Sequence, residues 1–290
     1  ASAVVYPDRP TPQLMFELLE RYRPTLFFGV PTLYASMLDT AARRDREQGT
    51  EPDPNAKHAF ASVRLCVSAG EALPTEVYHR FKRRYGVEII DGIGSTEMCH
   101  IFLSNRPGQV VPGSTGRPVP GYEIRLIDEQ GEEVADGEVG TLLVKGDSAA
   151  QFYWRKRAKT KKTMLGEWIN TGDKFYRDED GIYWCAGRGD DMLKVGGIWV
   201  SPVEVERCLI EHDSVLEAAV VGQADKDGLV KPRAYVVLGS DRRADQATAD
   251  ELKAFVKERL AKYKYPRWIE FVDELPKSST GKIQRFKLRE

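Results

Sequence analysis

The sequence has little cysteine and no long apolar run. Its four cysteines, Cys66, Cys99, Cys185 and Cys208, are widely separated and form no CxxC pair. This spacing argues against a zinc site or a disulfide framework and indicates a reducing compartment, which we take to be the cytoplasm. No stretch approaches the roughly 18 apolar residues that a transmembrane helix needs. We therefore expect no membrane partner.

The chain also lacks an excess of one charge. Of 290 residues, 43 are Lys or Arg and 44 are Asp or Glu, so the formal net charge is −1. This balance gives no general attraction to nucleic acid. The first eight residues contain neither the basic segment nor the apolar core of a signal peptide. A chain of this length buries a large core without disulfides, and its length suggests about two domains.

Three familiar catalytic motifs are incomplete. Gly92 begins a GxGxxG pattern, but Glu97 occupies the third glycine position. The pair at 281–282 resembles the end of a P-loop, but Pro276 stands where the loop begins. Cys66 replaces the first glycine of a nucleophile elbow. These mismatches argue against a dinucleotide-binding fingerprint, a P-loop and the nucleophile elbow of a hydrolase.

Three different patterns of predicted secondary structure follow one another along the chain. Residues 1–112 alternate helices and short apolar strands, which predicts a parallel sheet in an α/β layer. We expect helices over 13–22, 33–42 and 74–85, strands over 25–28, 63–68 and 87–90, and a solvated loop over the charged segment 43–57. Residues 113–187 show strands (122–127, 140–145, 182–185) separated by turns, which predicts an antiparallel, barrel-like unit.

The remaining residues predict a small α+β domain. We expect a hairpin over 192–200, helices over 202–212 and 249–262, strands over 217–221, 234–238 and 268–272, and a polar tail.

Four stretches carry the chemical interest: Asp91–Glu97, Trp168–Asp173, Gly187–Gly197 and Leu275–Lys282. In this order and at these separations they resemble the adenylate-forming superfamily, which includes acyl- and aryl-CoA ligases, luciferases and peptide-synthetase adenylation domains. The resemblance covers essentially the whole chain. It implies the C-terminal part of a large α/β plus β-barrel adenylation domain (1–187), a hinge (188–190) and a small mobile domain (191–290).

The resemblance implies a site for ATP and Mg²⁺. Thr96 offers a hydroxyl to a phosphate, and Glu97 is a hard oxygen ligand suited to Mg²⁺. Asp173 has two oxygens for the ribose diol, and Arg188 helps to hold the ribose and phosphate. The other expected nucleotide-binding residues are Gly70, Glu71, Asp91 and Gly92. Each also has a simpler explanation, because such residues are common in solvated turns, and Arg188 suits a surface ion pair.

Lys282 matches the lysine of the superfamily's last motif. When a carboxylate attacks the α-phosphate, negative charge builds up, and a positioned ammonium offsets it. The resemblance therefore implies that Lys282 is catalytic, although a lysine in a polar tail is more commonly only solvated.

Other segments are most similar to the benzoate-CoA ligases. These are 27–34, 68–74, 98–102 and 194–197. Small and apolar residues there predict a pocket for a flat aromatic ring: Ala69, Ile93, Gly94, His100 and Ile101. His100 is equally suited to a structural role. Ile93 stands where the superfamily often has an aromatic residue that stacks on adenine, which leaves that contact open.

The resemblance also implies two half-reactions with a domain rotation between them. Asp190 matches the pivot, although a polar turn explains it equally, and the loop with Lys194, Gly196 and Gly197 would admit the CoA thiol. The basic run 155–162 is expected to be a solvated face.

The implied activity is an ATP-dependent aryl-CoA ligase that forms benzoyl-CoA, or a related thioester, from an aromatic carboxylic acid and coenzyme A. A medium-chain acyl-CoA ligase is the alternative of the same type. A non-catalytic nucleotide-binding fragment is another, because the superfamily's upstream Ser/Thr/Gly-rich, lysine-ending phosphate loop has no counterpart in the sequence. The expected partner is therefore the remaining N-terminal part of the large domain.

Overall fold

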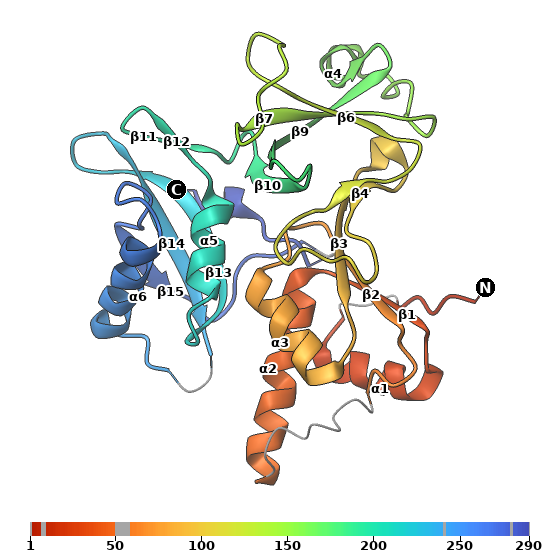
Figure 1. Ribbon diagram of the computed structural model, residues 1–290. Helices are drawn as coiled ribbons and strands as arrows, with labels where there is room; N and C mark the ends of the chain where they lie inside the picture. The colour runs from red at the N-terminus through yellow and green to blue at the C-terminus, as the bar shows by residue number, and fades with distance from the viewer. Residues whose placement is uncertain (1, 7–9, 50–58, 240–241, 279–280, 290) are drawn as a thin grey trace.

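The computed structural model describes residues 2–6, 10–49, 59–239, 242–278 and 281–289, and Figure 1 shows its layout. Three helices, α1 (Pro12–Tyr22), α2 (Pro31–Gln48) and α3 (Thr75–Tyr85), alternate with three strands, β1 (Leu26–Gly29), β2 (Leu65–Ala69) and β3 (Ile89–Gly94). These strands are parallel, as predicted. Two antiparallel strands that the sequence analysis did not identify, β4 (Ile101–Ser104) and β5 (Arg117–Pro118), extend the sheet in the order β1-β2-β3-β4-β5.

An aromatic core holds α2 and α3 against this sheet. Val77, Phe81 and Tyr85 recur every four residues and form the buried face of α3. Phe81 packs edge-on against Tyr34 of α2, with ring centroids 5.2 Å apart. Burial of such a side chain contributes about 2–3 kcal/mol to the stability of the folded state. The helices therefore give a rigid base for the loops that follow β2 and β3.

The prediction of a loop over 43–57 was wrong for residues 43–48, which continue α2. Long-range and local ion pairs favour the helix there. Asp45 receives two hydrogen bonds from Arg84 of α3, at 2.7 and 3.0 Å, and Arg43 pairs with Asp39 one turn earlier. Gly49, at φ 63°, ends the helix. The remainder of the predicted loop, apart from Gly49, lies outside the described residues.

The second unit is an antiparallel sheet, as predicted. Its order is β10 (Tyr183–Arg188), β9 (Trp168–Arg177), β7 (Gly140–Lys145) and β6 (Glu123–Ile127), and β8 (Met164–Leu165) pairs with β9. Strand β9 was not predicted, because Asn170, Gly172 and Asp173 are typical of turns. Pairing with β7 and β10 overrides that local preference. The basic run also contains a short helix, α4 (Arg157–Thr163), which was not predicted.

The C-terminal unit begins with the hairpin β11 (Leu193–Val195) and β12 (Ile198–Val200), followed by α5 (Pro202–Ile210). A three-stranded sheet has the order β13 (Val215–Ala224), β14 (Val230–Leu238) and β15 (Trp268–Phe271), with α6 (Gln246–Arg259) between the last two strands in sequence. Its core packs against α5 and α6. No helix within the described ranges is long and apolar enough to cross a membrane.

The tail, which ends in the 3₁₀ helix η3 (Arg285–Leu288), is more than a solvated polar segment. Leu275 is 1% exposed and packs with Ala219, Val221 and Tyr235 from the sheet face opposite α5 and α6. In Figure 1 the dark blue tail passes between the C-terminal unit and the first sheet. The end of the chain is thereby brought to the loops that follow β2 and β3.

Candidate functional site

A cavity of about 970 Å³ lies where the two larger sheets and the C-terminal unit meet. It opens at the carboxyl ends of β2 and β3, the usual ligand-binding edge of a parallel sheet. The candidate residues that line it are Gly70, Glu71, Asp91, Gly92, Ile93, Gly94, Thr96, Glu97, Asp173, Arg188, Asp190 and Lys282. Segments from all parts of the sequence therefore contribute to one concave site.

Lys282 reaches the cavity over Gly70. A Cβ added at Gly70 would lie 2.7 Å from the Cε atom and 3.5 Å from the Nζ atom of Lys282. Gly70 also has φ +98°, which side chains rarely adopt. Glycine at this position thus allows the turn after β2 and leaves room for the lysine stem.

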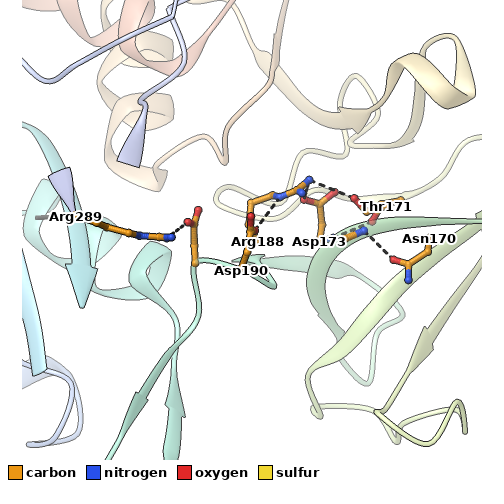
Figure 2. A network of polar contacts seen from close by, with 8 residues as sticks. Asn170, Thr171, Asp173, Arg188, Asp190 and Arg289 are labelled. Carbon is orange, nitrogen blue, oxygen red and sulfur yellow. Dashed lines mark hydrogen bonds and ion pairs between the residues drawn. The ribbon is translucent and has the colours of Figure 1, made fainter. Parts of the chain in front are cut away.

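Asp173 and Arg188 form a polar corner on the neighbouring strands β9 and β10. The Nη1 atom of Arg188 lies 3.3 Å from Asp173 Oδ1 and 3.3 Å from the Thr171 carbonyl oxygen, and its Nε atom lies 3.4 Å from Asp190 (Figure 2). Burial raises the pKa of Asp173 above its ordinary value, although Arg188 opposes this. The corner presents a carboxylate and a guanidinium together, a set that suits a sugar diol and a phosphate.

Glu97 also lines the cavity, in the short 3₁₀ helix η2 (Thr96–Met98). Tyr153 donates a hydrogen bond to its Oε1 atom, and the Lys159 Nζ atom lies 4.1 Å from the Tyr153 ring centroid. Burial would raise the pKa of Glu97, but hydrogen bonds from Tyr153 and nearby groups outweigh it, so the pKa is lowered. The Glu97 carboxylate therefore presents an anionic oxygen at the cavity that could serve as a metal ligand.

Asp91 is the most unusual ionisable group of the lining. It is 5% exposed within β3, and its Oδ1 atom has no hydrogen-bond partner among the described residues. Burial raises its pKa to about 7, while the nearby Leu73 N–H, the charge of Arg207 and the Ser68 hydroxyl act in the opposite direction. Ionisation of Asp91 therefore destabilises the folded state relative to the unfolded state.

We expect Asp91→Asn to stabilise the protein increasingly as the pH rises from about 4 to 7. In that range the unfolded carboxyl, with its ordinary pKa, loses its proton before the folded one does, so wild-type stability falls. With a folded pKa of about 7, the difference levels off above that pH at about 4 kcal/mol. Urea unfolding of the variant and the wild type at several pH values measures this difference in the free energy of unfolding. The exposed Asp180→Asn is the control, and an Asp91→Asn effect that is equal at pH 4 and pH 8 would contradict the prediction.

The glycines at 92 and 94 are explained by strand packing. A Cβ at Gly92 would lie 2.9 Å from the Leu103 carbonyl oxygen, and one at Gly94 would lie 2.4 Å from the His100 carbonyl oxygen. Strand β4 already fills that space, so these positions need glycine whatever binds in the cavity.

The structure does not bring every candidate residue to the cavity. The candidates outside its lining are Ala69, His100, Ile101, Lys194, Gly196 and Gly197. His100 is exposed, and Lys194, Gly196 and Gly197 lie exposed on the β11–β12 hairpin. In this arrangement Lys282, and not the hairpin, occupies the site.

Tyr153, Lys159 and Lys162 also line the cavity, and sequence reasoning missed them as site residues. Tyr153 lies 56 residues from Glu97, and no local motif connects the two. The basic run was the available signal for the lysines. No group of three or more His, Cys, Asp or Glu side chains in the described ranges is arranged to hold a metal, but Mg²⁺ normally takes one or two protein carboxylates and completes its shell with phosphates and water.

Two family models match the chain. The model for AMP-binding enzymes matches residues 1–154, and the model for the AMP-binding enzyme C-terminal domain matches residues 204–282. Among curated relatives, a benzoate–CoA ligase of Thauera aromatica is 55% identical over all of this chain and 53% of its own length. A 4-hydroxybenzoate–CoA/benzoate–CoA ligase of Rhodopseudomonas palustris is 51% identical over all of this chain and 52% of its own length. The chain spans about half the length of these relatives.

Solved structures agree with this likeness. A benzoate CoA ligase from Burkholderia xenovorans LB400 is 57% identical, with a TM-score of 0.90 over 100% of this chain and 56% of the other. An anthranilate CoA ligase in complex with anthranoyl-AMP is 48% identical, with a TM-score of 0.91 over 99% of this chain and 54% of the other. The fold matches a fragment of the adenylation fold.

Proposed function

Because this chain belongs to the AMP-binding enzyme family, we propose that it forms part of an ATP-dependent aryl-CoA ligase of the benzoate type. The observation that carries the proposal is the single cavity that gathers Thr96, Glu97, Asp173, Arg188 and Lys282. These residues supply hydroxyl, carboxylate and cationic groups, which are the types of group needed around a nucleotide and an acyl carboxylate.

In the first half-reaction, a carboxylate oxygen of the aromatic acid attacks the α-phosphorus of ATP, and pyrophosphate leaves. Asp173 and Arg188 hold the ribose and phosphate. Lys282 places its positive charge where the acid oxygen and α-phosphate meet, which lowers the cost of the charge that builds up there. The product is an aroyl-adenylate.

In the second half-reaction, the CoA thiolate attacks the aroyl carbonyl carbon, and AMP leaves. We assign residues 1–187 to the large domain, 188–190 to the hinge and 191–290 to the mobile domain. Rotation about Asp190 would withdraw Lys282 and bring Lys194, Gly196 and Gly197 to the site. The exposed position of the β11–β12 hairpin supports a role outside the first half-reaction.

Glu97 fits as the protein ligand of Mg²⁺. It provides an anionic oxygen at the cavity wall, and Tyr153 orients it through a hydrogen bond. The metal, when bound, would neutralise phosphate charge.

A substrate comparison tests the proposal in the full-length enzyme. We expect benzoate to support ATP-dependent pyrophosphate release with a kcat/KM at least about tenfold above that of hexanoate, because a rigid ring loses less conformational freedom on binding than a flexible chain does. Pyrophosphate release is measured with each acid at matched concentrations. A preference for hexanoate would indicate a medium-chain acyl-CoA ligase. Failure of ATP to raise the melting temperature would indicate a non-catalytic protein.

The proposed partner is the remaining N-terminal part of the large domain. The relatives are about twice as long as this chain, and the edge strand β1 leaves Phe28 61% exposed. Cys66, Cys99, Cys185 and Cys208 are free thiols, which supports the cytoplasm as the proposed compartment.

A further inference from the structure

The backbone on both sides of Lys282 is held by side chains from the first unit. Ile283 donates its N–H to Glu71 Oε1 at 2.8 Å, and Thr32 donates its hydroxyl to the Gly281 carbonyl oxygen at 3.3 Å. These contacts join residues 212 and 249 positions apart. Lys282 lies between the two, so they fix the position of its backbone relative to the cavity.

The segment that carries Lys282 is braced within the C-terminal unit. Ser278 donates its N–H to the Lys282 carbonyl oxygen at 2.8 Å, and Lys282 donates its N–H to Ser278 Oγ at 3.1 Å. Beyond the loop, Arg285 makes two hydrogen bonds to Glu206, at 2.9 and 2.7 Å. Contacts within the C-terminal unit therefore hold Ser278, Lys282 and Arg285, and contacts to the first unit hold the residues on either side of Lys282.

The receiving surface closely matches the segment in shape and charge. A Cβ at Gly281 would make a tight contact of 3.1 Å with Val30 Cγ2, and φ at this position is +85°, which side chains rarely adopt, so glycine favours this approach. Burial raises the pKa of Glu71, while the Ile283 N–H and the charge of Arg285 favour its ionised form. Glu71 is thus a half-buried acceptor whose charge is supported by the segment it holds.

We propose that Thr32 and Glu71 are positioning residues, which dock the Lys282 segment for adenylate formation. For Glu71, which the sequence analysis expected to bind the nucleotide, this assigns a role through the Ile283 N–H instead. The inference rests on the proposed function. The contacts exist only while Lys282 is docked, so their loss is expected to slow adenylate formation and to spare thioester formation from supplied benzoyl-AMP.

The test uses full-length enzyme with two pairs of variants. Thr32 is outside the lining of the large cavity. Thr32→Val removes the hydroxyl and is expected to slow adenylate formation about fivefold, the scale of one net hydrogen bond, whereas Thr32→Ser keeps wild-type activity. Glu71→Ala is expected to slow it about 10- to 100-fold, and Glu71→Gln, which retains an acceptor oxygen, recovers most of the loss.

Two further measurements separate positioning from a general structural role. In a Lys282→Ala background, Thr32→Val is expected to cause no further loss, because it acts through the lysine. Hydrogen exchange at the Ile283 amide is expected to speed up in Glu71→Ala and Thr32→Val.

The inference is overturned if either variant slows both half-reactions equally, if the losses of Thr32→Val and Lys282→Ala add fully, or if exchange at Ile283 is unchanged. A wild-type enzyme that forms no aroyl-AMP would overturn the proposed function instead, and the exchange experiment would still test the docking contacts.

Discussion

Lys282→Ala in the full-length enzyme is expected to lower the rate of aroyl-adenylate formation by about 10²–10³-fold or more, the scale for loss of one preorganised charge stabiliser. The structure places the Lys282 stem against Gly70 at the cavity, where no side chain blocks its approach. Thioester formation from supplied benzoyl-AMP is expected to survive, because attack by CoA does not need this cation. Single-turnover measurement of each half-reaction checks the two rates separately.

The exposed Lys287 of the same tail provides the matched control, since it lies outside the lining of the cavity. Lys287→Ala is expected to leave both half-reactions near wild type. Acylation of the Lys282 amine should reproduce Lys282→Ala, because it removes the same charge. Equal losses of both half-reactions in Lys282→Ala would show that the lysine is structural.

Asp190→Pro is expected to lower thioester formation by about 10²-fold, the scale on which a small misplacement of reacting groups acts, while adenylate formation stays within a few-fold of wild type. Proline fixes φ near −65° and disfavours the helical region for Gly189, so it restricts the junction where the chain passes between the units. The junction is well held in the present arrangement: Gly189 donates its N–H to the Gly172 carbonyl oxygen at 2.9 Å, and Arg289 pairs with Asp191 (Figure 2).

Asp190→Ala separates the backbone effect from loss of the carboxylate, which lies 3.4 Å from Arg188 Nε. It keeps the N–H and the rotation about φ, so both half-reactions are expected to remain close to wild type. The two-state interpretation of the junction fails if Asp190→Pro lowers both half-reactions to the same extent or changes neither.

Much of the fold could be predicted from the sequence because its signals are local. The four-residue spacing of Val77, Phe81 and Tyr85 indicates α3, and alternation over Glu123–Ile127 indicates β6. The elements that were missed have local signals that conflict with their structure. Strand β9 contains the turn-forming residues Asn170 and Gly172, and only its pairing with β7 and β10 makes it a strand.

The candidate site likewise has features that the sequence indicated and features that only the structure showed. The resemblance to the adenylate-forming superfamily, carried by four ordered motifs, implied roles for Thr96, Glu97, Asp173, Arg188 and Lys282. The structure places all five around one cavity. The sequence analysis also singled out Gly92 as a nucleotide-binding residue and Gly94 as part of the aromatic-ring pocket. Their packing against β4 became visible only in the structure.

The sequence by itself determined which residues are candidates for the chemistry, which segments are helical or extended over most of the chain, and the family that these patterns resemble. Only the tertiary structure decided how those residues are held. Tyr153 donates a hydrogen bond to Glu97, and Thr32 and Glu71 make hydrogen bonds to the backbone on either side of Lys282. The reason is physical. Propensity and periodicity act between neighbours in the sequence, whereas these contacts join residues 56 to 249 positions apart and arise only when the packed core brings their segments together.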